Sequence, residues 1–262
     1  LENCKVNSIT FNEEMFNLET TKGNFTATVC CGSYGKKSNL DVKWNRTFTR
    51  QQSRKLNQYA GIKYHVQTNF AADTIALHNF KNGYCGISKI EENNYCLCYL
   101  THMSNIRQAG QSIAAMEETI LSENPHLKAI FNNAIKINKE PVSIAQVSFL
   151  KKTQVEEHVL LLGDAAGMIT PLCGNGMSMA MHASLLAAIQ IEAFLESKIN
   201  RLEMEKNYTS LWNHHFSKRL ATGRMIQYFF GKKWITNLFI KTMKRIPYLT
   251  RKVIKMTHGD PF

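Results

Sequence analysis

The stretch at residues 159–180, VLLLGDAAGMITPLCGNGMSMA, constrains the fold of this chain more than any other part of it. Four apolar residues that end at Gly163 are typical of a short buried strand. Gly174 and Gly176 follow Pro171 and open a long run of small and apolar residues, which indicates a helix. The predicted order is therefore strand, irregular loop and helix, and it favours an α/β fold.

This order of elements also predicts a ligand site. The first amides of a helix have no partner within the helix and carry the positive end of its dipole, so they suit a phosphate or a delocalised anion. Glycines in the loop let the backbone approach such a ligand closely. Asp164 comes directly after the strand, where α/β sheets bind their ligands.

The residues Gly163-Asp164-Ala165-Ala166, then Pro171, then Gly174-x-Gly176 and a small-residue helix resemble a known motif. It is the second flavin-binding motif of the FAD-dependent oxidoreductases that include the geranylgeranyl reductases and p-hydroxybenzoate hydroxylase. The resemblance implies FAD as the cofactor. The cofactor-binding residues that it implies are Gly163, Asp164, Pro171, Gly174, Asn175, Gly176, Met177 and Ser178.

The resemblance also implies a role for each part of the motif. Asp164 would bind a ribityl hydroxyl of FAD, and the backbone near Pro171 would line the isoalloxazine. The amides of residues 175–178 would face N1 and O2 and stabilise negative charge on the reduced flavin. Two alternatives remain: a strand–helix turn without a ligand, and a methyltransferase-like loop. The second would place its glycines directly after the strand, whereas Gly174 stands ten positions after Asp164.

The implied fold is α/β, with an incomplete Rossmann-like FAD-binding domain, an inserted antiparallel β-sheet substrate domain and C-terminal helices. The family begins with a strand, Gly-x-Gly-x-x-Gly and a helix, which hold the ADP half of FAD. The chain shows no such motif in its 262 residues, so we expect it to be the C-terminal part of a longer protein. The expected domains are 1–45 (FAD-binding), 46–150 (substrate), 151–200 (return to the FAD-binding domain) and 201–262 (basic helical region).

A second flavin-related element lies near the start of the chain. Alternating apolar residues predict a small β-meander over 5–31, with a turn at 20–24 and a last strand at 25–31. The following Gly-Ser-Tyr-Gly-x-x-Ser at 32–38 resembles the family's Gly-Ala-Asp-Gly-x-x-Ser. In the hydroxylases that Asp is associated with contacts to FAD and to the reduced nicotinamide cofactor. This chain has Tyr34 at the position, which puts direct reduction by NAD(P)H in question. A plain turn into a helix is the alternative, and residues 42–57 are interpreted as a solvated basic loop.

The middle of the chain predicts an antiparallel sheet. Residues 59–101 alternate in polarity, with hairpin turns at 81–83 and 91–94. Helices are expected at 104–121 and 124–132, and a strand at 142–150. In the resembled family such a sheet is the substrate-side wall of the flavin site. The substrate-contact candidates are Tyr64, His65, His78, Tyr84 and Tyr99, and the alternative for each is a core or rim position.

Two subgroups of the family lose support. Geranylgeranyl reductases tend to carry Tyr-x-Trp-x-Phe-Pro where this chain has Gly86 in place of the Trp and no Pro in the segment 83–89. Flavin halogenases carry Trp-x-Trp-x-Ile-Pro, and the chain contains no Trp-x-Trp. Cys173 is the one weak catalytic candidate, as a thiolate near the flavin. The alternative for Cys173 is a small residue that fits, and the seven cysteines show no zinc-ligand spacing.

The C-terminal residues 218–262 differ in character. They hold eleven Lys and Arg and one acid, Asp260, so they carry ten of the chain's twelve net positive charges. Aromatic and aliphatic residues are interleaved, a pattern typical of helices on anionic membrane surfaces. The alternative is packing on the body of the protein with the basic groups in water. No nucleic-acid partner is expected, because no binding motif accompanies the charge.

The sequence thus predicts an FAD-dependent oxidoreductase that acts on a hydrophobic, isoprenoid or aromatic, small molecule. A polar start and the lack of a spanning apolar run predict a cytoplasmic protein, peripheral at the inner membrane face. The alternatives are a flavin monooxygenase that uses NAD(P)H and oxygen, and a non-catalytic, flavin-less fragment or membrane-surface module. Reduction and oxygenation are not distinguished.

Overall fold

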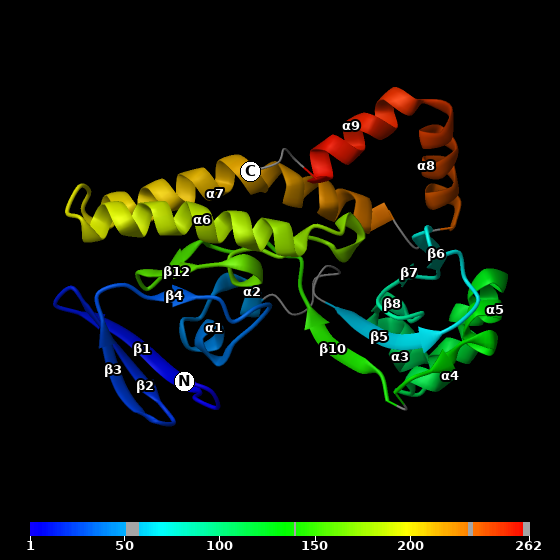
Figure 1. Ribbon diagram of the computed structural model, residues 1–262, viewed down its shortest axis with the longest axis horizontal. Helices are drawn as coiled ribbons and strands as arrows, with labels where there is room; N and C mark the ends of the chain where they lie inside the picture. The colour runs from blue at the N-terminus through cyan, green and yellow to red at the C-terminus, as the bar shows by residue number, and fades with distance from the viewer. Residues whose placement is uncertain (51–57, 139, 230–232, 259–262) are drawn as a thin grey trace. The chain divides into compact units, whose positions relative to one another are not determined.

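The computed structural model describes residues 1–50, 58–138, 140–229 and 233–258 of the chain. The chain divides into two compact units (Figure 1). The first unit comprises residues 1–52, 149–225 and 252–262, and the second comprises 53–148 and 226–251. Each unit is built from segments far apart in sequence. The four-domain division expected from the sequence stays a prediction.

The first unit begins with the expected β-meander. Strands β1 (Val6–Asn12), β2 (Met15–Thr20) and β3 (Gly23–Ala27) form an antiparallel sheet in that order. The prediction of one strand over 25–31 was wrong. β3 ends at Ala27, and the separate strand β4 (Cys31–Gly32) pairs in parallel with β12 (Val159–Leu161). The hydrogen bonds of these two short segments go to different sheets, which local alternation cannot reveal.

Strand β12 is the centre of the first unit. It lies between β4 and the short antiparallel strand β11 (Val155–Glu156), and its three residues are fully buried. After β12 come the 3₁₀ turns η3 (Gly163–Ala165) and η4 (Pro171–Cys173), then helices α6 (Gly176–Leu195) and α7 (Arg201–Phe229). The predicted strand–loop–helix order is confirmed.

Helices α6 and α7 lie side by side over β12 (Figure 1). The Tyr208 hydroxyl of α7 donates to the Leu161 carbonyl at 2.6 Å. Gly167 allows this close packing, because a Cβ there would lie 2.7 Å from the Trp212 ring. Among the described residues, α6 is the one helix with the length and apolarity to cross a membrane, and core helices of soluble proteins meet the same test.

The expectation of a solvated basic loop at 42–57 was wrong for its first part; residues 51–57 lie outside the described residues. Helix α1 (Asn39–Lys43) begins with a capping box between Ser38 and Asp41, and α2 (Thr47–Arg50) follows. Arg46, between the two helices, is only 3% exposed. Its guanidinium has buried partners that a basic composition does not indicate.

The second unit is the predicted antiparallel sheet, in the order β10-β5-β8-β7-β6, with β9 beside β5. Its strands are β5 (Tyr59–Gln67), β6 (Ala76–Phe80), β7 (Gly83–Lys89), β8 (Tyr95–His102), β9 (Ile135–Lys136) and β10 (Val142–Val147). The hairpin turns at 81–83 and 91–94 are confirmed.

Short helices cover one face of this sheet. They are α3 (Met103–Gln108), α4 (Ile113–Thr119), the 3₁₀ turn η2 (Leu121–Glu123) and α5 (Pro125–Asn133). The single helix expected over 104–121 is interrupted, because Gly110 adopts a left-handed backbone with φ 65°. The unit also includes the basic helix α8 (Lys233–Arg245), while α9 (Pro247–His258) ends the described chain.

Candidate functional site

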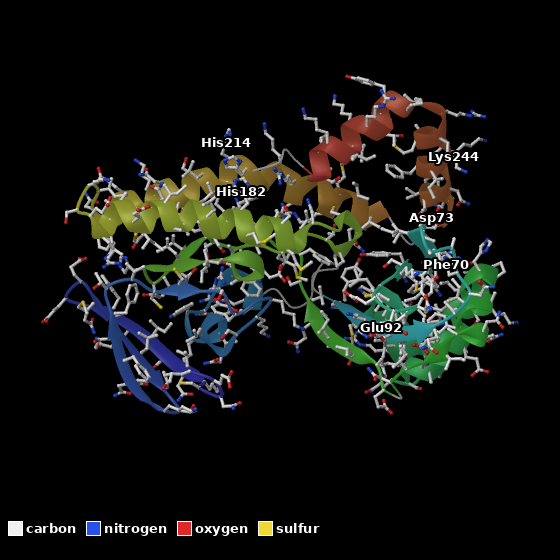
Figure 2. All side chains as sticks on the ribbon, viewed as in Figure 1. Phe70, Asp73, Glu92, His182, His214 and Lys244 are labelled. Carbon is white, nitrogen blue, oxygen red and sulfur yellow. The ribbon has the colours of Figure 1, made fainter. Side chains whose placement is uncertain are left out.

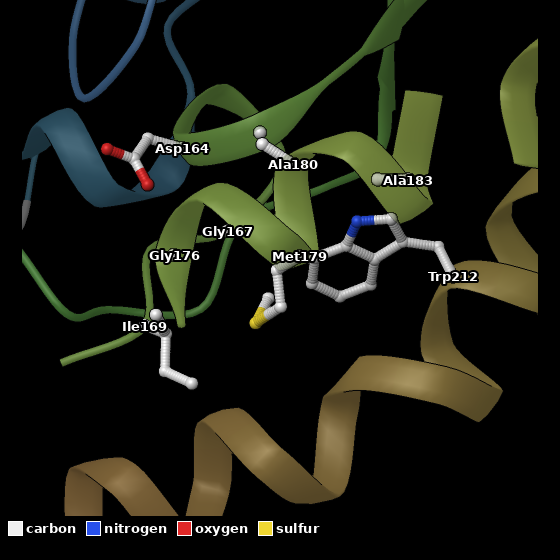
Figure 3. A pocket seen from close by; sticks show the side chains of 9 residues that line it. Asp164, Gly167, Ile169, Gly176, Met179, Ala180, Ala183 and Trp212 are labelled. Carbon is white, nitrogen blue, oxygen red and sulfur yellow. The ribbon is translucent and has the colours of Figure 1, made fainter. Parts of the chain in front are cut away.

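The loop after β12 presents Asp164 at the carboxyl end of the parallel strand pair. The Leu162 amide donates to the Gly32 carbonyl at 3.0 Å, which ties the start of the loop to β4. No described residue donates a hydrogen bond to the Asp164 carboxylate, which in Figure 3 points away from Met179 and Trp212. Burial raises the pKa of Asp164, and the nearby Lys152 charge opposes that rise. The carboxylate is thus an acceptor without a donor.

The N-terminus of α6 lies next in the chain and is also without a cap. The N-cap residue Asn175 accepts no hydrogen bond from the helix amides through its side chain, while its Nδ2 donates to the Thr257 carbonyl at 2.7 Å. Its Oδ1 has no partner among the described residues. The residue before it, Gly174, has φ 69°, and a Cβ there would meet no atom within 4 Å. Open space therefore borders the positive end of a 20-residue helix.

A small cavity lies behind the loop (Figure 3). Its volume is about 10 Å³, and Asp164, Gly176, Met179 and Trp212 are among the residues that line it. This volume accommodates one water molecule and no organic ligand. The cavity therefore leaves no room for a cofactor, and the loop is open on the side where Gly174 is exposed and Met177 is 84% exposed.

A cluster of buried charged side chains donates hydrogen bonds to the backbone of the Asp164 loop. Arg46 Nη1 lies 2.6 Å from Asp41 Oδ1 and 3.1 Å from the Ala165 carbonyl, and both charged side chains are almost completely buried. Lys152 Nζ donates to the Asp164 and Lys36 carbonyls, both at 2.7 Å. The sequence pattern did not indicate either residue as part of a site, and the stretch that contains Arg46 was interpreted as a solvated basic loop.

Tyr34, which replaces the family's Asp, is part of the same cluster. Its hydroxyl donates to Asp41 Oδ1 at 2.7 Å, and Arg46 Nη1 lies 3.3 Å from the same hydroxyl. Burial, followed by the hydrogen bond to Asp41, raises the pKa of Tyr34. The segment 32–38 is a turn into α1, as the alternative interpretation of this element had it, and it is also joined to the flavin-motif loop through Arg46.

Cys173 lies in η4 and is 5% exposed. Its Sγ is 3.4 Å from Thr170 Oγ1, and burial raises the pKa of the thiol. A raised pKa keeps a thiol protonated at neutral pH, which disfavours a thiolate mechanism. These surroundings favour the alternative, a small residue that fits its place, and the catalytic assignment stays a prediction.

The five substrate-contact candidates do not share one face of the sheet. Tyr64 and Tyr99 lie on the helix-covered face, where their hydroxyls donate to Glu117 Oε1 at 2.8 and 2.7 Å. Both rings are buried in the core. This hydrogen-bonded burial gives the two tyrosines a structural role.

The other three candidates have different surroundings. His78 stacks on His126 at 5.5 Å, beside a cavity of about 630 Å³. Burial and then the His126 charge lower the pKa of His78. Strand register places His65 opposite Cys96, and Tyr84 opposite Leu100, on the face away from the short helices. Their substrate roles stay predictions.

Comparison with known proteins identifies the family. Residues 87–229, more than half of the chain, match the family model described as squalene epoxidase. The chain belongs to the squalene epoxidase family. The match runs from β7 through the Asp164 loop to the end of α7. The resemblance to FAD-dependent oxidoreductases is confirmed, and FAD is the cofactor of that superfamily.

The chain is also similar to individual proteins. The chain is 28% identical over 163 residues to conditioned medium factor receptor 1 of Dictyostelium discoideum, covering 59% of this chain and 31% of that protein. It is 32% identical over 101 residues to digeranylgeranylglycerophospholipid reductase of Methanococcus vannielii, covering 37% and 25%. The chain thus matches about a quarter to a third of the length of these curated relatives.

A solved structure with the same fold is a flavin-dependent brominase. Its TM-score is 0.74 at 19% identity, and the alignment covers 98% of this chain and 64% of the brominase. At this identity the likeness shows the fold and not the reaction. The predicted α/β class with a Rossmann-type flavoprotein architecture is confirmed.

Proposed function

We propose that this chain is part of an FAD-dependent oxidoreductase that acts on a hydrophobic small molecule, isoprenoid or aromatic. One observation carries the proposal. The chain belongs to the squalene epoxidase family, and the loop after β12 carries the Asp164 carboxylate, to which no described residue donates a hydrogen bond. The N-terminus of α6, which follows in the chain, has no side-chain cap. These two features fit a ligand that has both hydroxyl groups and an anionic edge. A fragment that binds no flavin would need neither the free carboxylate nor the uncapped helix N-terminus.

The residues of the site have separable roles in this proposal. Asp164 accepts a hydrogen bond from a ribityl hydroxyl, and the amides of residues 175–178 face the pyrimidine edge of the flavin. Gly174 keeps the approach open, and the backbone near Pro171 lines the ring. FAD supplies the two-electron redox chemistry when bound. The protein orients the ring and stabilises negative charge on it through the dipole of α6.

The family match, to squalene epoxidase, favours oxygen insertion over reduction of the substrate. The relative from Methanococcus vannielii is named as a reductase. NAD(P)H is the proposed ultimate reductant. Tyr34 is bonded to Asp41 and Arg46, and it offers no carboxylate at the position where the hydroxylases have one. Delivery of electrons by a separate reductase protein is therefore as compatible with this chain as direct reduction.

The test is the visible absorption spectrum of the full-length protein. We expect flavin absorption in the purified protein, or after FAD is added to it and the excess is removed. Bleaching by an added reductant, and its reversal in air, would show that the bound flavin is redox-active. A colourless full-length protein that takes up no FAD would contradict the proposal.

The C-terminal helices support a second part of the proposal, docking on an anionic membrane surface. Helix α8 exposes Trp234 and Leu238, at 72% and 58%, one turn apart on one face. Basic side chains such as Lys244 are exposed on the same helix (Figure 2). Helix α9 exposes Tyr248 and further basic residues. Apolar anchors with basic neighbours are typical of helices at the interface of anionic lipid.

We expect that the double substitution Trp234→Glu/Leu238→Glu weakens binding to anionic vesicles by at least about tenfold, because each apolar side chain that becomes buried in the bilayer interface contributes about 1.5–3 kcal/mol. Co-sedimentation measures the effect. The control is Ile75→Glu, which changes a side chain that is 79% exposed outside these helices. Equal binding by the double variant and the wild type, or binding by neither, would contradict membrane docking. Peripheral location in the cytoplasm is proposed on the same basis.

A further inference from the structure

Lys152 is a buried cation that joins two loops of the first unit. Its Nζ donates to the carbonyl of Lys36, in the segment that contains Tyr34, and to the carbonyl of Asp164. Both distances are 2.7 Å, and the residue is 6% exposed. The ammonium also lies 4.5 Å from the centroid of the Phe48 ring. One side chain therefore fixes the backbone of the Asp164 loop against the loop that follows β4.

The surroundings of Lys152 disfavour the charged form of its side chain. Burial, and then the Arg46 charge, lower the pKa of Lys152 from 10.5 to about 8, while Asp41 and Asp164 act in the opposite direction. Lys36 faces it through its carbonyl and Phe48 through its ring. A buried charge that is bonded mainly to carbonyls contributes little to stability compared with an apolar side chain of the same length. Stability alone does not account for a lysine here.

We propose that Lys152 is a positioning residue for the flavin, which holds the Asp164 backbone so that the carboxylate is directed to the ribityl chain. The inference rests on the proposed FAD site. Asp164 itself has no other side-chain bond to fix it among the described residues. Because Lys152 binds the carbonyl of the same residue, a shift of this anchor moves the carboxylate directly. Charge-assisted bonds to both carbonyls make the anchor stronger than a neutral donor would.

The first experiment measures FAD affinity in the full-length protein. Lys152→Met keeps the length of the side chain and removes its charge and donors. We expect the dissociation constant for FAD, from fluorescence titration, to rise about tenfold or more, since two charge-assisted bonds are lost. Lys151→Met is the matched control, because Lys151 is exposed beside it, and its FAD affinity should equal that of the wild type. Thermal unfolding of both apo variants checks folding.

The second experiment uses pH, which a purely structural lysine would not link to FAD. In the wild type, FAD affinity should fall several-fold between pH 7 and pH 9, as Lys152 loses its proton near pH 8. In Lys152→Met the same profile should be flat.

The free energy of unfolding of the apo wild type, measured relative to Lys152→Met, should rise with pH. Between about pH 8 and 10.5 the unfolded chain holds the proton that the folded chain has released, so the folded state gains stability as the pH increases.

The outcomes separate the two proposals. Equal FAD affinity of folded Lys152→Met and wild type overturns the role of Lys152 and leaves the proposed function intact. If Lys152→Met does not fold, the pH profile of the wild type decides. An FAD affinity that is constant from pH 7 to pH 9 then overturns the role of Lys152. A full-length wild type that binds no FAD at all overturns the proposed function, and the positioning role with it.

Discussion

The variant Asp164→Ala is expected to lose most of its affinity for FAD, by about 30- to 150-fold. Removal of a charged hydrogen-bond acceptor costs about 2–3 kcal/mol, and each 1.4 kcal/mol is a factor of ten. No described residue donates to this carboxylate, so its loss leaves no partner unsatisfied within the chain. The unfolding free energy of the apo protein should therefore change by less than about 1 kcal/mol. The flavin absorption retained after gel filtration, with a fluorescence titration, measures the loss.

Two further variants make this prediction specific. Asp164→Asn keeps the shape and one acceptor oxygen, so its affinity should lie between those of the wild type and Asp164→Ala. Asp73→Ala removes an exposed carboxylate of the second unit and should leave FAD binding unchanged. Full FAD content in Asp164→Ala would show that the loop after β12 does not bind the ribityl chain.

The variant Arg46→Met is expected to lose about 3–5 kcal/mol of unfolding free energy. It removes one partner of a buried ion pair and leaves the Asp41 carboxylate buried without its cation, which is the costly way to break such a pair. The Ala165 and Thr153 carbonyls lose their donor as well. Urea unfolding followed by circular dichroism measures the change. FAD affinity should fall too, because Ala165 is part of the flavin-motif loop.

A matched set of variants identifies the unpaired charge as the cause. Lys43→Met removes an exposed basic residue of the same stretch, and its effect should be below about 0.5 kcal/mol. Asp41→Asn/Arg46→Met removes both charges and should recover about 1–2 kcal/mol of the loss. If Arg46→Met costs less than about 1 kcal/mol, the ion pair does not have the role that its burial indicates.

The sequence was sufficient where local pattern and function coincide. Gly163, Pro171, Gly174 and Gly176 predicted the strand–loop–helix element, because proline fixes φ at its own position and glycine permits the left-handed backbone found at Gly163 and Gly174. The hairpins of the second unit followed from alternation and turn residues. The family match confirms that this motif belongs to a flavoprotein. The roles of the single residues in the motif remain predictions.

The sequence was insufficient where partners come from distant segments. Whether a strand residue faces the core or the open side depends on register and on what covers each face, so Tyr64 and His65 could not be separated in advance. The break at Gly110 has a local cause instead, the left-handed backbone of this residue. Local periodicity on both sides of Gly110 favours helix and does not reveal this break.

The amino-acid sequence by itself determined the strand–loop–helix element of the proposed flavin site, since the groups proposed to bind are backbone groups and one carboxylate within 22 consecutive residues. Only the tertiary structure decided which charges are buried beneath that element. Arg46 and Lys152 have the composition of solvated residues, and the free energy of a charge depends on the groups that surround it. Those groups, Asp41 and the carbonyls of Lys36, Asp164 and Ala165, come from segments that only the folded chain brings together.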